Sequence, residues 1–241
     1  MVRTKKKLLR MLRPMNYYLF TIWRLKILQI SIHSWGINRK LPKSNQKGLF
    51  LDCGSNVGQG FEFFRKYYPN KFYDYVLFEP NPHCFGVLED KYAALESDGV
   101  QLRNVAVGIK NDNINFYGLD REKGGIFSVG GSVLSEHNSK IYTTSNNPSM
   151  KVVSIDFAEF VIDLLKKNDY RVVILKLDIE GGEYAVLSSL MSKNLISLFE
   201  TIYVEFHSKY MSNQFANEYK NREKAFLRYS RKIKTRVIQW I

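Results

Sequence analysis

Short apolar runs alternate with amphipathic stretches from Gly48 to the end of the chain. Runs rich in β-branched and aromatic residues are typical of buried strands, and apolar residues at helical spacing indicate the helices between them. The strands expected are 48–52, 75–78, 100–107, 114–117, 151–155, 171–177, 201–206 and 236–241, and the helices are 58–68, 82–96, 156–167 and 181–191. This alternation predicts an α/β fold with a doubly wound, mostly parallel sheet and helices on both faces.

The chain changes character at a polar, turn-rich link, residues 41–48, with the sequence LPKSNQKG. We place a boundary there and expect a basic, partly helical N-terminal extension over residues 1–47 and one α/β domain over residues 48–241. A chain of 241 residues is too short for two full catalytic domains of ordinary size.

Apolar residues recur at helical spacing within this extension, at Leu19, Trp23, Ile27 and Ile30. One interpretation is a helix that lies on an anionic membrane surface, helped by the basic residues that precede it. The other is a helix that packs on its own domain and covers a pocket there. We favour the second, because apolar stripes on helices more often face a protein core than lipid.

Net charge is distributed unevenly along the chain. Residues 1–50 hold twelve Lys or Arg and no acid, residues 51–219 hold sixteen basic and twenty-two acidic residues, and residues 220–241 hold eight basic and one acidic residue. The basic ends favour contact with anionic lipid, glycolipid or RNA, whereas the acidic middle argues against a nucleic-acid groove there.

The cysteines and the hydropathy indicate a cellular location. Cys53 and Cys84 form neither a disulfide framework nor a zinc-binding spacing, which favours a reducing compartment. The longest uncharged run near the start, residues 27–38, is shorter than the roughly 20 residues that a spanning helix needs. We expect a cytoplasmic protein without a secretory signal, associated with a membrane at most peripherally.

A glycine-containing segment follows the first expected strand. Residues 50–60, FLDCGSNVGQG, differ from the dinucleotide fingerprint GxGxxG, because the glycines are spaced GxxxGxG and Asp52 precedes the first of them. A cofactor that has a cationic sulfonium and an amino group but no phosphate would gain from such a carboxylate. Gly54 and Gly58 would then let the backbone approach that cofactor closely. The alternative is a purely structural turn.

Polar residues also end the next two expected strands. Glu79 follows the second strand, where a carboxylate can accept both hydroxyls of a ribose, and Pro80 stops the strand directly after it. Asn104 lies where an adenine edge would be contacted. An ordinary loop acid and an Asn in a turn are the structural alternatives for these two positions.

A second polar cluster lies in the C-terminal half. Asp178 follows a strongly apolar strand, where an uncompensated carboxylate would be costly. Glu180 and Glu183 lie in the first turn of the next helix, where acids commonly cap the helix. Glu205 and His207 end a further strand at the same edge, and His207 beside Glu205 is a candidate general base.

These motifs, in this order, resemble the FkbM family of methyltransferases. The resemblance covers residues 48–207 and rests on FLDCGSNVG, FEPNP, RNVAVG, GGSVL, LKLDIEGGE and VEFH. It implies the Rossmann-like class I methyltransferase fold, with S-adenosylmethionine as cofactor and O-methylation of a sugar, a glycan or a small polyhydroxylated metabolite as the reaction. In that family Asp52, Gly54, Asn56 and Glu79 look like cofactor contacts, and Asp178, Glu180 and Glu183 match its LK-D-EG-E signature.

We therefore expect an S-adenosylmethionine-dependent O-methyltransferase. The residues predicted to bind the cofactor are Asp52, Gly54, Ser55, Asn56, Gly58, Glu79, Asn104 and Asp178, and the candidate catalytic residues are Asp178, Glu205 and His207. No metal site is assigned, because oxygen ligands leave no diagnostic spacing. The alternatives are an RNA methyltransferase guided by the basic ends and a scaffold without catalytic activity. We expect a small-molecule or glycan acceptor rather than nucleic acid.

Overall fold

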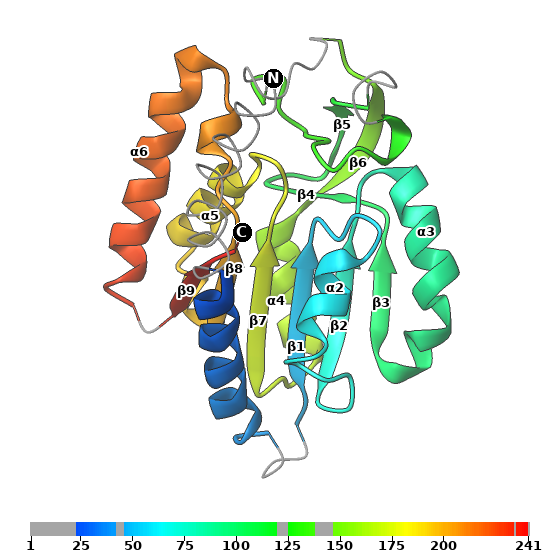
Figure 1. Cartoon of the computed structure of the whole chain (residues 1–241), viewed down its shortest axis with the longest axis vertical. Helices are drawn as coiled ribbons and strands as arrows, with labels where there is room; N and C mark the ends of the chain where they lie inside the picture. Colours follow the sequence, from blue (N-terminus) through cyan, green and yellow to red (C-terminus); the bar gives the residue numbers. More distant parts are fainter. Residues whose placement is uncertain (1–22, 42–45, 120–124, 138–146, 234, 241) are drawn as a thin grey trace, which may run out of the picture.

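The computed structural model describes residues 23–41, 46–119, 125–137, 147–233 and 235–240. Its main sheet has six strands in the order β3-β2-β1-β7-β8-β9, and all neighbouring strands pair in parallel (Figure 1). The strands are β1 (Gly48–Cys53), β2 (Tyr73–Phe78), β3 (Val100–Arg103), β7 (Val172–Leu177), β8 (Thr201–Val204) and β9 (Arg236–Gln239). The doubly wound α/β fold expected from the sequence is confirmed.

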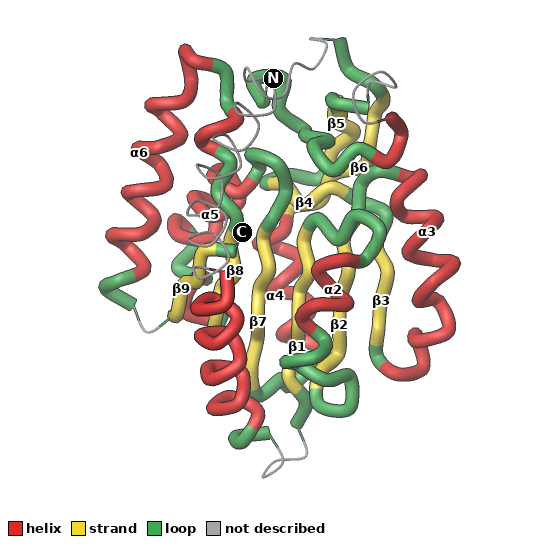
Figure 2. The backbone as a smooth tube through the Cα atoms, viewed as in Figure 1, coloured by secondary structure: helices red, strands yellow, loops and turns green. Residues whose placement is uncertain are grey.

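Helices cover both faces of this sheet (Figure 2). One face packs against α4 (Phe157–Lys167), α5 (Glu183–Ser192) and α6 (Asn213–Ser230). The other packs against an N-terminal helix of residues 23–38, α2 (Gln59–Phe64) and α3 (Pro82–Tyr92). Within β1, Leu49 and Leu51 face the first layer and Phe50 faces the second, as the two-residue repeat of a strand requires.

The strand expected at residues 100–107 is wrong as a single element. The chain turns after β3, and β4 (Ala106–Gly108) joins a separate three-stranded sheet in the order β4-β6-β5. The other members are β5 (Asp112–Phe116) and β6 (Met150–Asp156), which pair antiparallel. An apolar run shows that residues are buried but does not show which sheet buries them.

Helix α6 is an element that the sequence analysis missed. Only Tyr219, Phe226 and Ser230 are buried along its 18 residues, so its apolar stripe is sparse. Most of its residues are polar or charged, so the segment contains no apolar run that marks a helix, although its few apolar residues recur at helical spacing.

The N-terminal helix packs on the α/β domain. Ile30, Ile37 and Leu41 belong to the same core cluster as the residues of α2 and β1. Nε2 of His33 lies 2.5 Å from Oγ1 of Thr201 in β8, and Asn38 Nδ2 donates to the Tyr67 carbonyl at 2.7 Å. Leu19 and the basic cluster before it lie outside the described residues. None of the helices that the structure describes is long and apolar enough to cross a membrane.

Candidate active site

A cavity of about 560 Å³ lies at the carboxyl ends of the central strands, where ligands bind in open α/β sheets. This volume falls within the usual range for small-molecule sites. The N-terminal helix contributes Lys26, Ile27 and Ile30 to its wall, and the segment between β4 and β6 contributes Phe116 and Val133. Elements far apart in the sequence therefore enclose the site.

The loop after β1 forms one side of this cavity and contains Gly54, Ser55 and Asn56. Gly54 has a φ of +80°, and a Cβ there would lie 1.8 Å from the Asp178 carbonyl oxygen. A Cβ at Gly58, with φ of +96°, would lie 2.5 Å from the Tyr92 ring. The two glycines thus allow protein segments to pack closely against each other. From the sequence we expected them to let the backbone approach a cofactor, but Gly58 does not line the cavity.

Glu79 lies in the cavity wall and holds this loop. Its Oε2 accepts a hydrogen bond from the Asn56 N–H at 2.8 Å, and its Oε1 accepts one from the Asn81 N–H at 2.9 Å. Burial raises the pKa of Glu79 to about 7, although both N–H groups oppose this shift. Asn56 itself adopts a left-handed φ of 48°, a conformation that Asn tolerates better than most residues.

Asp52 lies behind the cavity wall. It is fully buried and forms an ion pair of 3.0 Å with Nζ of Lys176, its cross-strand neighbour in β7. Burial alone would lower the pKa of Lys176, but the carboxylates of Asp52 and Asp178 raise it, which favours the charged ammonium group. We expected the carboxylate of Asp52 to bind the positively charged part of the cofactor. The structure corrects this expectation, because Asp52 pairs with Lys176 and does not line the cavity.

Two further residues that were predicted to bind the cofactor donate hydrogen bonds to backbone carbonyl groups of the protein. Ser55 lines the cavity, but its Oγ donates to the Asp52 carbonyl at 3.0 Å. Asn104 is absent from the cavity wall, and its Nδ2 donates to the carbonyls of Glu79 at 2.8 Å and Pro80 at 3.3 Å. Asn104 therefore braces the turn after β2, as the structural alternative proposed.

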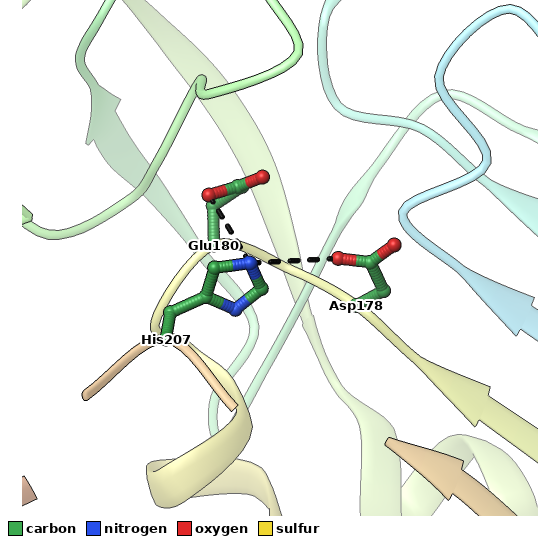
Figure 3. A group of neighbouring side chains, drawn as sticks. All are labelled: Asp178, Glu180 and His207. Atoms are coloured by element: carbon green, nitrogen blue, oxygen red, sulfur yellow. Dashed lines mark ion pairs between the residues drawn. The ribbon is translucent and has the colours of Figure 1, made fainter. Parts of the chain in front are cut away.

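The other end of the site gathers carboxylates around one imidazole. Nδ1 of His207 lies 2.8 Å from Oε1 of Glu183. Nε2 of His207 lies 3.3 Å from Oε2 of Glu180 and 3.7 Å from Oδ1 of Asp178, as Figure 3 shows. Glu205 Oε1 is 3.9 Å from the same nitrogen. The candidate catalytic residues Asp178, Glu205 and His207 are thus brought together.

The charges in this cluster change the role predicted for His207. Burial alone would lower its pKa, but the carboxylates of Glu183 and Glu180 raise it to about 12. Both ring nitrogens face carboxylates and His207 does not line the cavity, so the geometry does not favour the predicted role of general base for His207. Burial and the Asp178 carboxylate raise the pKa of Glu205, which lines the cavity and is the better base.

Glu183 fixes the geometry of this cluster. Its carboxylate is fully buried and accepts hydrogen bonds from the N–H groups of Ile179 and Gly181, both at 2.9 Å. Glu183 therefore ties the turn that precedes α5 to the His207 ring, and it does not cap the helix, because both N–H donors lie before the first helical residue. Glu180 adopts a left-handed φ of 53° beside it, a strained conformation that is typical of functional sites.

His137 and Ser132 are site residues that the sequence analysis missed. Nε2 of His137 lies 3.1 Å from Glu180 Oε2, and Ser132 Oγ donates to the Glu180 carbonyl at 2.6 Å. Burial alone would raise the pKa of Glu180, but hydrogen bonds from His137 and His207 lower it to about 2. The GGSVL motif contains Ser132 and was the one signal for this contact.

Side chains that could hold a metal ion meet in the same cluster. Within the described part of the chain, one ligand atom each of Asp178, Glu180 and His207 lie within 4.8 Å of one another. Carboxylate oxygens with one neutral imidazole suit several divalent cations, so an ion could bind here only with loss of a ring proton from His207. No metal site was predicted from the sequence, because these residues do not occur at a spacing along the chain that identifies a metal site.

The strand order and the cavity at the carboxyl edge define a Rossmann-like α/β protein with a binding site for a small molecule. Residues 52–229 match the Methyltransferase FkbM domain. The chain therefore belongs to the FkbM methyltransferase family, as the sequence motifs predicted.

Two other comparisons add little to this assignment. The crystal structure of methyltransferase FkbM from Methylobacillus flagellatus KT is similar, with a TM-score of 0.39 and 12% sequence identity. The similarity covers 63% of this chain and 30% of that chain, so this chain matches less than a third of that protein. No curated protein matches the chain.

Proposed function

We propose that this protein transfers a methyl group from S-adenosylmethionine to a hydroxyl oxygen of a sugar, a glycan or a small polyhydroxylated metabolite. The observation that carries the proposal is a single cavity with two chemically different ends. Glu79 lies in its wall beside the loop after β1, and Asp178 and Glu205 lie in its wall beyond β7 and β8. One end suits a ribose, and the other suits an acceptor hydroxyl.

The residues of the first end fit the proposed cofactor. The Glu79 oxygens each accept one N–H hydrogen bond from the protein, and a carboxylate has further lone pairs that can accept ribose hydroxyls. The apolar side chains of Ile27, Phe78 and Val107 line the same cavity and can pack against a purine. S-adenosylmethionine, when bound, supplies a methyl group activated by its positively charged sulfur.

The acceptor end has residues that can orient and deprotonate a hydroxyl group. As the acceptor oxygen forms a bond to the methyl carbon and the carbon–sulfur bond breaks, the hydroxyl proton passes to Glu205, whose pKa burial has raised. Asp178, 23% exposed, can accept a hydrogen bond from the same or a neighbouring hydroxyl. The imidazolium of His207 holds these carboxylates in place. Alignment contributes most of the rate, on the order of 7 kcal/mol or more.

Methyl transfer from radiolabelled S-adenosylmethionine tests this function. The acceptors are nucleotide sugars, lipid-linked glycans and small polyols, and methylated product is separated from the cofactor. The Glu205→Gln variant should reduce kcat by about 100-fold or more, because it removes the proton acceptor but keeps the shape of the side chain.

The matched control is Glu200→Gln, which alters an exposed carboxylate outside the cavity wall and should keep full activity. An active Glu205→Gln variant would exclude the proposed base. Failure of the wild-type protein to bind S-adenosylmethionine at all would exclude the proposed function.

A further inference from the structure

The outer side of the N-terminal helix is apolar and exposed. Leu25, Leu28, Ile32 and Trp35 are each between 54% and 62% exposed. Their spacing of i, i+3, i+7 and i+10 places all four on one side of the helix. We call these four residues the outer stripe. Single exposed apolar residues are ordinary, but a contiguous row of four large ones marks an interaction surface.

The outer stripe is not the packing face of the helix. Ile30, Ser34 and Ile37 are only 2–3% exposed and face the α/β domain. The helix is held to the domain by His33 and Asn38, so it does not need the outer stripe in order to bind to its own domain. Both sides of this helix are therefore apolar, and the domain covers one of them.

A basic residue lies at each end of the outer stripe. Arg24 adjoins its first member, and the guanidinium carbon of Arg39 lies 4.6 Å from the centre of the Trp35 ring. Residues 1–50 contain twelve Lys or Arg and no acidic residue. Large apolar side chains with a basic border are the composition of helices that lie in the interface of an anionic bilayer.

We infer that the outer stripe docks on the surface of a membrane that contains anionic lipid. A second copy of the chain is a poorer occupant, because two such strongly basic surfaces repel each other. RNA is poorer as well, because its phosphates match the basic residues but cannot cover leucine and isoleucine side chains. The inner side of the same helix lines the cavity through Lys26, Ile27 and Ile30, so docking would bring one wall of the cavity close to lipid head groups. This inference does not depend on the proposed methyl transfer.

Flotation of the full-length chain with vesicles tests the inference. Vesicles of phosphatidylcholine are compared with vesicles that also contain about 30 mol % phosphatidylglycerol, at physiological ionic strength. Wild-type protein should float with the anionic vesicles and much less with the neutral ones. The variant Leu28→Ser/Ile32→Ser/Trp35→Ser should lose at least about tenfold in partition coefficient, because it removes most of the apolar area that lipid would cover.

A matched control and a folding check accompany this variant. Val153→Ser alters a side chain of similar exposure, 51%, in the small sheet and should float like wild type. Circular dichroism and thermal unfolding should be unchanged in all variants, since the altered side chains are exposed. Equal flotation of wild type and the triple variant would overturn the inference, as would equal binding to neutral and anionic vesicles. It would also be overturned if the wild type formed dimers without lipid and the triple variant were monomeric.

Discussion

Cofactor binding should depend on pH through the ionisation of Glu79. This carboxyl group has a pKa of about 7 because it is buried, so near neutral pH it is ionised in only about half of the molecules. Ribose hydroxyls donate hydrogen bonds to the ionised form, and binding must therefore expel the proton. From a pKa of about 7 the apparent Kd should be about tenfold weaker at pH 6 than at pH 8.

Isothermal titration calorimetry at pH 6 and pH 8 measures this dependence. The ligand should be 5′-deoxy-5′-methylthioadenosine, which carries the adenine and the ribose but lacks the ionisable amino acid portion of the cofactor. In Glu79→Gln the pH dependence should disappear, and affinity should fall on the order of 10- to 100-fold, because hydrogen bonds to a charged acceptor are lost. Glu205→Gln should keep the slope of wild type, since its carboxylate lies at the acceptor end.

Two results would refute this reasoning. One is a wild-type Kd that changes by less than about twofold between pH 6 and pH 8. The other is a Glu79→Gln variant whose Kd changes with pH as much as that of wild type.

The stability of the ligand-free protein should also depend on pH through Glu79. Because the pKa of Glu79 is higher in the folded state than in the unfolded state, its protonated form stabilises the folded protein at low pH. The contribution of Glu79 should be complete below about pH 4.5 and should be lost as the pH rises through about 7.

Three further predictions concern the close packing and the charge pairs around the cavity. Lys176→Met should reduce the free energy of unfolding in urea by about 3–5 kcal/mol, because it leaves the buried carboxylate of Asp52 without a partner. Gly54→Ala should cost at least about 2 kcal/mol in the same assay, because φ is +80° and the new Cβ would overlap a carbonyl oxygen. Long-range ¹H–¹⁵N NMR should show both ring nitrogens of His207 protonated at pH 9, and Glu183→Gln should lower that pKa.

The two predictions on stability have control variants. Lys40→Met removes an exposed ion pair with Glu200 and should cost less than about 1 kcal/mol, so an equal loss in Lys176→Met and Lys40→Met would contradict the role of burial. Gly36→Ala, with nothing within 4 Å of the added Cβ, is the control for Gly54. A neutral His207 ring at pH 7 would contradict the expectation that the carboxylates of Glu183 and Glu180 keep it protonated. His207 would then again be a candidate for the general base.

The sequence by itself determined most of the order of strands and helices, although it did not reveal α6, and it determined the polar residues at the carboxyl ends of the strands. Both are local properties, because burial imposes a two-residue repeat on strands and a 3.6-residue repeat on helices. The parallel sheet followed from the alternation of these elements, and the positions of Glu79, Asp178 and Glu205 at one edge followed from the sheet. Periodicity carries no information about partners, however, so it did not show that β4 leaves the main sheet.

Only the tertiary structure decided which charges meet. Asp52 and Lys176 are 124 positions apart, yet β1 and β7 make them cross-strand neighbours, and the two side chains form a buried ion pair. His207 has an ordinary sequence context, but Glu183 and Glu180 contact its two ring nitrogens in the fold and raise its pKa. The interaction energy of two charged groups depends on the distance between them and on the low dielectric constant of their surroundings. Spacing along the chain encodes neither quantity. The same holds for the N-terminal helix, whose two apolar sides are distinguishable only once one of them is covered.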